Sequence, residues 1–125
     1  MRAVRTAHTS PELRLRRVLW AAGLRYRLHS KRIPGRPDIA FGLAKLAVFV
    51  DGCFWHGCPR CYTPPGTNAS FWRAKLRANR KRRVQVRKAL RAIGWIHREV
   101  WECEIEQDPT RVAKRLQSVV SARRT

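Results

Sequence analysis

The apolar residues near the N-terminus recur at helical spacing and would share one face: Leu15, Val18, Leu19 and Ala22. The preceding run Thr-Ser-Pro-Glu at 9–12 supplies a hydroxyl cap, a proline for the first turn and a carboxylate for the positive end of a helix dipole. Gly23 is a typical residue to end a helix. Together these signals predict a helix that begins near Ser10 and ends at Gly23.

Residues 26–50 contain the shorter apolar runs that are typical of strands. Residues 26–29 predict a short strand, and the basic turn 31–37 contains two prolines and a glycine, which exclude regular structure. Residues 38–41 and 46–50 predict a pair of strands joined through Gly42. The second of these runs is continuously apolar, as expected for a strand covered on both faces, so we place it in the centre of the sheet.

The second half of the chain predicts two helices with a strand between them. After the Pro-Pro-Gly break at 64–66, Ser70 caps a long basic helix over about 71–93 that ends at Gly94. Its apolar positions are Leu76, Val84, Val86, Leu90 and Ile93. Residues 95–101 predict a strand, and Pro109 opens an amphipathic helix that continues through Val119. The order of elements predicts an α/β fold in a single domain, residues 1–125, with a mixed central sheet flanked by helices.

The chain is strongly basic, with 28 lysines and arginines against 8 acidic residues and a formal charge of +20. Such an excess favours a polyanionic partner that offsets the self-repulsion of the compact state, and nucleic acid is the leading candidate. A membrane is disfavoured, since no apolar run approaches the roughly 20 residues of a spanning helix and no signal-peptide pattern follows Met1. The alternative is that arginine is merely abundant, as in proteins from GC-rich genomes.

The spacing of the four cysteines suits a metal ion: Cys53, Cys58 and Cys61 lie in one loop, and Cys103 lies further along the chain. We predict a structural zinc site with four thiolate ligands. Two disulfides are the alternative, which the tight spacing and the lack of a signal sequence disfavour. Zinc would hold the loop 51–61 rigid, together with the other side chains that this loop carries.

Carboxylates are scarce, and only Glu12, Asp38 and Asp51 precede Glu99. Asp38 opens the first strand of the predicted pair and Asp51 closes the second, so both should lie at one edge of the sheet with the Val50 carbonyl. Oxygen ligands at such an edge, on a basic surface, suit a magnesium ion that meets a phosphate. Each acid also has a purely structural interpretation: Asp38 in its turn, Asp51 in an Asx turn, and Glu12 at the helix dipole.

The cysteine loop also carries His56. A neutral imidazole near a phosphate can take the proton of an attacking water, so His56 is a candidate general base. The alternatives are a fifth metal ligand or a packed loop residue. We expect the other histidines, His8, His29 and His97, to be ordinary surface or core residues.

Phe54, Trp55 and Trp72 are candidate DNA contacts. Apolar side chains on a rigid support can wedge between base steps, although adjacent aromatics are also common in cores. The lysines and arginines of the long helix have the density expected of phosphate contacts, which position a protein on DNA without reading the sequence.

Motifs spread over nearly the whole chain resemble those of the very short patch repair (Vsr) endonucleases, mismatch-nicking relatives of the PD-(D/E)XK nucleases. They are Thr-Ser-Pro-Glu-Leu at 9–13, Pro-Gly-Arg-Pro-Asp at 34–38, Val-Phe-Val-Asp-Gly-Cys-Phe-Trp-His-Gly-Cys-Pro at 48–59, Asn68, Phe71-Trp72, Lys75, Asn79, Gly94-Trp95, and Trp-Glu-Cys-Glu at 101–104. The resemblance implies a zinc-stabilised, restriction-endonuclease-like α/β nuclease. Such an enzyme binds duplex DNA at a T:G mismatch and nicks one strand beside the thymine, using magnesium.

The resemblance also implies roles for single residues. Asp38 looks like the magnesium-binding aspartate, and the Val50 carbonyl looks like a second metal contact. His56 looks like the general base, and Glu12 like the glutamate that completes the site. The four cysteines look like structural zinc ligands. The residues expected to contact DNA are Met1, Phe54, Trp55, Trp72, Lys75 and Arg36.

Three departures from the family pattern are visible. Val50-Asp51 stands where characterised members can carry threonine-histidine, so Asp51 is a carboxylate able to bind metal directly. The pair Arg82-Arg83 stands in place of the usual acidic residue after Asn79. In the zinc motif, Cys58 stands where some relatives use histidine, and the spacing to the next cysteine is one residue longer than in some members.

We therefore predict a magnesium-dependent DNA mismatch endonuclease in which Asp38 and Asp51 hold the metal and His56 activates water. The expected partner is double-stranded, mismatched DNA, with no membrane, and we expect a monomer in the bacterial cytoplasm, associated with the nucleoid. Two alternatives stay open. One is a catalytically silent, zinc-stabilised DNA-binding module, and the other is a nuclease of the same fold that acts on other distorted DNA.

Overall fold

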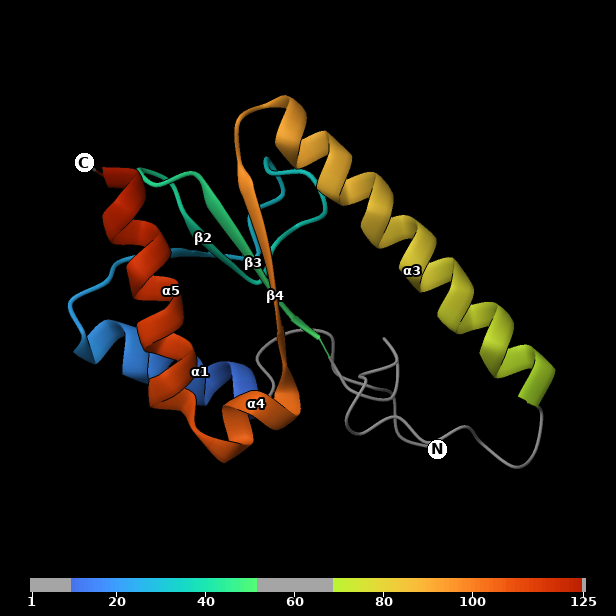
Figure 1. The fold of residues 1–125 in the computed structure, drawn as a ribbon, viewed down its shortest axis with the longest axis horizontal. Helices are drawn as coiled ribbons and strands as arrows, with labels where there is room; N and C mark the ends of the chain where they lie inside the picture. Colours follow the sequence, from blue (N-terminus) through green and yellow to red (C-terminus); the bar gives the residue numbers. More distant parts are fainter. Residues whose placement is uncertain (1–9, 52–68, 125) are drawn as a thin grey trace.

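Four strands form one mixed sheet in the computed structural model, which describes residues 10–51 and 69–124 (Figure 1). The strands are β1 (Arg27–Leu28), β2 (Ile39–Phe41), β3 (Leu46–Asp51) and β4 (Ile96–Trp101), and they lie in the order β1-β2-β3-β4. β1 pairs with β2, and β2 with β3, in antiparallel fashion, whereas β3 and β4 are parallel. The predicted antiparallel pair and the central position of the apolar strand are both confirmed.

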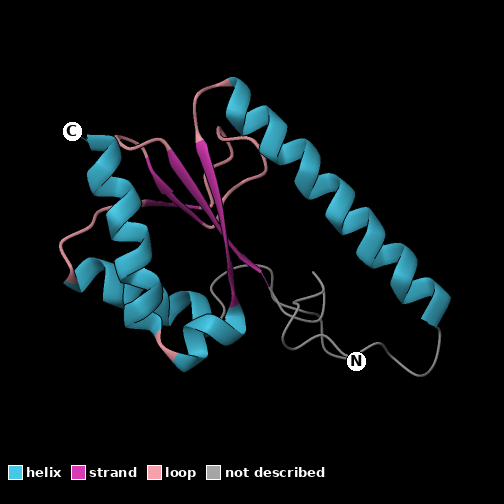
Figure 2. Ribbon diagram, viewed as in Figure 1, coloured by secondary structure: helices cyan, strands magenta, loops and turns pink. Residues whose placement is uncertain are grey.

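Helices cover both faces of this sheet (Figure 2). α1 (Ser10–Ala21), α4 (Glu102–Gln107) and α5 (Pro109–Arg124) lie on one side, and α3 (Ala69–Ala92) lies on the other. The predicted mixed sheet flanked by helices is therefore confirmed. None of the helices in the described ranges is long and apolar enough to cross a membrane.

The alternation of side chains along β3 explains its continuous apolar run. Leu46 and Val48 belong to the large core formed with α1, α4 and α5, whereas Ala47 and Phe49 pack in a smaller cluster with Leu90 of α3. Successive residues of a strand point to opposite faces, so both sets must be apolar when both faces are covered. The same alternation directs the next residue of this series, Asp51, towards α3.

The predicted helix ends are largely confirmed. α1 is followed by Gly23 and α3 by Gly94, each at a positive φ, 88° and 80°, that suits glycine best. Two apolar residues predicted for this helix, Val84 and Ile93, are 45% and 50% exposed. Ile93 lies just beyond the end of α3 at Ala92.

One element was not predicted from the sequence. β4 continues directly into α4, whose six residues are Glu-Cys-Glu-Ile-Glu-Gln. Ile105 of this helix is buried in the large core, and Cys103 lies in its first turn. A segment this short, with a single strongly apolar anchor, has too little periodicity to indicate a helix.

Candidate active site

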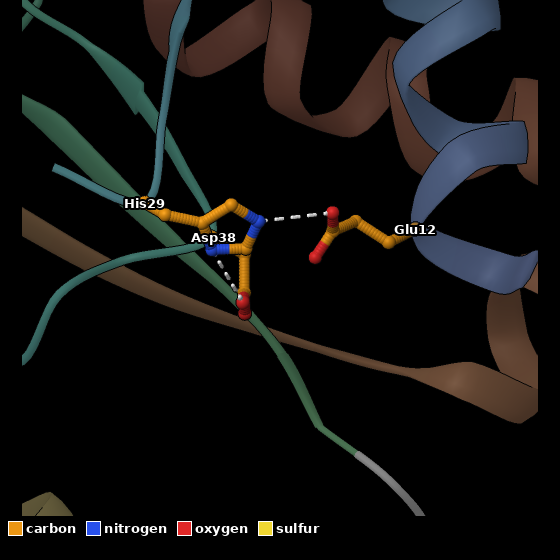
Figure 3. A group of neighbouring side chains, drawn as sticks. All are labelled: Glu12, His29 and Asp38. Carbon is orange, nitrogen blue, oxygen red and sulfur yellow. Dashed lines mark hydrogen bonds and ion pairs between the residues drawn. The ribbon is translucent and has the colours of Figure 1, made fainter. Parts of the chain in front are cut away.

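Three polar side chains from separate parts of the chain meet beside one edge of the sheet (Figure 3). Glu12 comes from the first turn of α1, His29 follows β1, and Asp38 precedes β2. The imidazole of His29 lies between the two carboxylates, with Nε2 3.2 Å from Glu12 Oε2 and Nδ1 3.6 Å from Asp38 Oδ1. One ligand atom from each residue lies within 4.8 Å of the others. We call these three residues the Glu12–His29–Asp38 group.

Glu12 is placed in this group by the burial of the first turn of α1. The residue is only 1% exposed, and its Oε2 accepts a hydrogen bond of 2.9 Å from Arg16, one helical turn further on. A carboxylate removed from water is costly unless charged or hydrogen-bonding partners compensate it. Arg16 and His29 both supply such contacts to the same oxygen. Glu12 therefore does more than complement the helix dipole, which was the structural alternative for it.

Asp38 is fixed by the end of β3. Its Oδ2 accepts a hydrogen bond of 2.7 Å from the backbone N–H of Val50, which confirms that Asp38 and Val50 lie together. In an extended strand the N–H and C=O of one residue face the same side, so the Val50 carbonyl also faces Asp38. Burial raises the pKa of Asp38 to about 6, an effect that the Val50 N–H opposes and the Glu12 charge reinforces. The Glu12 carboxylate and the Val50 carbonyl thus lie near the Asp38 carboxyl group, whose ionisation a bound cation would favour.

The structure corrects the expectation that His29 is an ordinary residue, because it is the member that joins the two carboxylates. No local pattern in the sequence indicates this role. His29 is separated by 17 residues from Glu12, and contact depends on how α1 packs against the strands. His97, in contrast, fits the expectation of a core residue. It packs on the Phe49 ring with 5.0 Å between centroids, and burial lowers its pKa to about 4.

Asp51 lies on the other side of β3 and does not join the Glu12–His29–Asp38 group. Its Oδ1 is 2.7 Å from Nη2 of Arg83, in α3. The Arg83 guanidinium also lies over the Phe49 ring, 4.3 Å from its centroid, and 3.9 Å from a carboxylate oxygen of Glu99. Burial raises the pKa of Asp51 to about 7, against the opposing effect of Arg83. The metal-binding role of Asp51 stays a prediction, and Arg83 is a partner that the sequence did not indicate.

The candidate DNA contacts within the described ranges lie on two surfaces. In α3, Trp72 is half-buried and meets the Phe71 ring edge-on, and Lys75 is exposed. Arg36 is exposed in the turn that leads to Asp38. Exposed cations occur along the whole length of α3: Arg73, Lys75, Arg77, Arg80, Lys81, Arg82, Arg87, Lys88 and Arg91. We call these nine residues the α3 cation row.

Other predicted residues lie outside the described ranges: Met1, His8, Cys53, Phe54, Trp55, His56, Cys58 and Cys61. Of the four predicted zinc ligands the structure therefore places Cys103, which is half-buried in the first turn of α4. The zinc site and the general base stay predictions.

Comparison with known sequences identifies the family. The sequence model of the family described as DNA mismatch endonuclease Vsr matches residues 1–63, about half of the chain. The chain belongs to the Vsr family. The matched segment contains all three members of the Glu12–His29–Asp38 group, so the site described above lies within the part of this Vsr-type DNA endonuclease that matches the family.

Named relatives of this Vsr-type endonuclease match over most of its length. The Type II nicking enzyme V.XorIIP of Xanthomonas oryzae pv. oryzae is 44% identical over 107 residues, 84% of this chain and 78% of that protein. The Type II nicking enzyme V.NmeDIP of Neisseria meningitidis serogroup C is 37% identical over 122 residues, 96% and 82% of the two chains. The DNA mismatch endonuclease Vsr of Escherichia coli is 36% identical over 107 residues, 84% and 68% of the two chains.

Proposed function

We propose that this protein is a magnesium-dependent endonuclease that nicks one strand of duplex DNA next to the thymine of a T:G mismatch. Such a nick initiates very short patch repair. The observation that carries the proposal is the carboxylate of Asp38, held by the Val50 N–H and facing Glu12 and His29 in a Vsr-family chain. The names of the relatives, nicking enzymes and a mismatch endonuclease, support the same reaction.

The donors at this site fit magnesium. Carboxylate and carbonyl oxygens are the hard ligands that Mg²⁺ prefers, and it is usually held by one or two carboxylates with water and phosphate oxygens. We propose that Asp38 and the Val50 carbonyl hold the ion, with Glu12 completing the site. When bound, Mg²⁺ would polarise the scissile phosphate and offset the charge of the transition state. The predicted ligand role of Asp51 is tested by an Asp51→Asn variant, which should weaken Mg²⁺ binding if that role is correct.

Proton transfer and DNA binding are assigned to side chains of the protein. We propose that His56 takes the proton of the attacking water, because an imidazole titrates near neutral pH. We propose that the α3 cation row binds the phosphates of the duplex, supported by its exposure along the helix. Trp72 is proposed to act with Phe54, Trp55 and Met1 as an apolar wedge at the mismatch. Lys75 and Arg36 are proposed phosphate contacts.

We further propose that Cys53, Cys58, Cys61 and Cys103 bind a structural zinc ion. The parallel register of β3 and β4 supports this, since Asp51 pairs with Trp101. Cys53 and Cys103 each follow one of these paired residues by two positions in the sequence. Metal analysis of protein purified without chelator should find zinc, and Cys103→Ser should release it and unfold the domain. Protein that is folded and zinc-free would refute the zinc site and leave the nuclease proposal in place.

The test of the proposed function is a cleavage assay on a panel of duplexes that differ at one base pair: T:G, other mismatches and a paired control. Each is incubated with Mg²⁺ or with EDTA. We expect nicking of the T:G duplex with Mg²⁺, and loss of nicking but not of DNA binding in Asp38→Asn and His56→Ala. Nicking that ignores the mismatch would favour the nuclease of other distorted DNA. Binding without any nicking would favour the silent DNA-binding module.

We also propose that the protein acts as a monomer in the bacterial cytoplasm, on DNA of the nucleoid. The bacterial sources of the relatives support this location.

A further inference from the structure

We propose that His29 is a positioning residue of the metal site: its imidazole ties the carboxylate of Glu12 to that of Asp38 and so fixes Asp38 for the cation. This inference rests on the proposed function, because it concerns the same site. It adds a residue to which neither the sequence motifs nor the family match assign a role.

The first observation is that His29 presents a different ring nitrogen to each carboxylate (Figure 3). Nε2 is within hydrogen-bonding distance of Glu12 Oε2, at 3.2 Å. Nδ1 lies 3.6 Å from Asp38 Oδ1, which is an electrostatic contact rather than a hydrogen bond. A single ring therefore spans from α1 to the start of β2.

The second observation is that the two carboxylate oxygens of Asp38 have different partners. Oδ2 accepts from the Val50 N–H, and Oδ1 is the oxygen that faces His29. The carboxylate is thus held from two directions, by the backbone of β3 and by an imidazole. Groups that orient a metal ligand without touching the metal set its geometry and strengthen binding. His29 occupies that place relative to Asp38.

The third observation is the backbone of His29, which has a φ of 47°. This left-handed conformation is uncommon for residues other than glycine and is favoured where surrounding contacts enforce it, often at functional sites. The His29 N–H also donates a hydrogen bond of 3.3 Å to the Asp38 carbonyl. Backbone and ring thus connect the same two residues.

The experiment measures cation binding directly, with Mn²⁺ as a spectroscopic probe of the magnesium site. Electron paramagnetic resonance gives the Mn²⁺ affinity of the full chain without DNA, and thermal unfolding is recorded in parallel. An Asp38→Asn variant establishes that the signal comes from this site. Removing a group that orients a metal ligand typically weakens binding by about 10- to 100-fold.

His29→Gly is the main variant, because glycine accepts the left-handed backbone and the fold should tolerate it. We expect its Mn²⁺ affinity to fall by at least about tenfold in a protein that still unfolds cooperatively. His29→Gln restores N–H donors whose hydrogen bonds the carboxylates can accept, so it should bind Mn²⁺ more tightly than His29→Gly. Lys45→Gly is the matched control. Lys45 also has a positive φ, 53°, but lies in the exposed turn between β2 and β3, so its replacement should leave Mn²⁺ affinity unchanged.

The inference is overturned if His29→Gly binds Mn²⁺ as the wild type does, or if His29→Gln binds no better than His29→Gly. Its failure is distinct from failure of the proposed function. A wild type whose Mn²⁺ affinity depends on Asp38 and on His29, but which nicks no DNA, would refute the proposed function alone. A wild type that nicks T:G duplexes while His29→Gly keeps full Mn²⁺ affinity would refute the role of His29 alone.

Discussion

The carboxylate of Asp51 lies 2.7 Å from the guanidinium of Arg83, and this ion pair joins the end of β3 to the basic helix α3. The two side chains are only 3% and 17% exposed, although 32 residues separate them in the sequence. Both residues belong to the departures from the Vsr pattern that the sequence comparison by motif indicates: Asp51 in the pair Val50-Asp51, and Arg83 in the pair Arg82-Arg83. The structure shows that the two departures contact each other and complement each other in charge.

Breaking this ion pair should destabilise the protein more than removing it altogether. Arg83→Leu leaves the Asp51 carboxylate buried without its cation, which typically costs about 3–5 kcal/mol, whereas the Asp51→Leu/Arg83→Leu double variant removes both charges. Urea unfolding in EDTA, at a pH above the raised pKa of Asp51, gives the free energies of unfolding of the wild type, Asp51→Leu, Arg83→Leu and the double variant. We expect the double variant to be more stable than Arg83→Leu. Strictly additive losses would show that the two side chains do not interact.

Magnesium binding should weaken as the pH falls below the raised pKa of Asp38. That pKa is about 6, so the carboxyl is ionised at neutral pH and protonated in mild acid. A proton on the ligand competes with the cation, so the apparent dissociation constant should rise about tenfold per pH unit below this value. Isothermal titration calorimetry with Mg²⁺ between about pH 5 and pH 7.5 would measure the effect. An affinity that is constant over this range would contradict the assignment of Asp38 as a ligand.

Gly35→Ala should destabilise the turn that leads to Asp38. A Cβ at Gly35 would clash with Cγ1 of Val86 in α3, and the residue has a φ of 80°. Overpacking of this kind typically costs about 1–3 kcal/mol in addition to the backbone strain. Gly23→Ala is the matched control, because Gly23 has a similar φ of 88° but open space around its Cβ position. Urea unfolding should show the larger loss for Gly35→Ala, and equal losses would exclude the close contact with α3.

The α3 cation row should account for much of the salt dependence of DNA binding. Each phosphate contact contributes about 0.9 to the slope of log affinity against log salt concentration. The variant Arg77→Ala/Arg80→Ala should therefore reduce that slope by up to about 2. The control Arg111→Ala/Lys114→Ala removes the same charge from exposed positions of α5, across the sheet (Figure 1). Fluorescence anisotropy at several salt concentrations compares the two, and equal changes would mean that net charge alone matters.

The elements of this fold were largely predictable because their signals are local. The cap and stop residues of α1, the apolar run of β3 and the glycine after α3 each lie within a few positions of the element they define. The site was only partly predictable. Asp38 and Val50 were expected together because an antiparallel pair fixes their relation, and the Val50 N–H contact confirms it.

The contacts that could not be predicted from the sequence depend on how the helices pack on the two faces of the sheet. His29 reaches Glu12 only because α1 lies against the strands, and Arg83 reaches Asp51 only because α3 covers the opposite face. Alternation along β3 turns Asp51 towards α3, away from the side where Glu12 lies. The chain order of Asp38 and Asp51 therefore does not by itself predict which side of the sheet each carboxylate faces.

The most direct test of the account is strand-resolved mapping of the products from a T:G duplex with each strand labelled in turn. We expect that, with Mg²⁺, the wild type cuts only the thymine strand, at the phosphate beside the mismatched thymine. Neither EDTA-treated wild type nor Asp38→Asn should produce this cut. Cutting of both strands, cutting of the T:A duplex at the same rate, or full activity in Asp38→Asn would contradict the account.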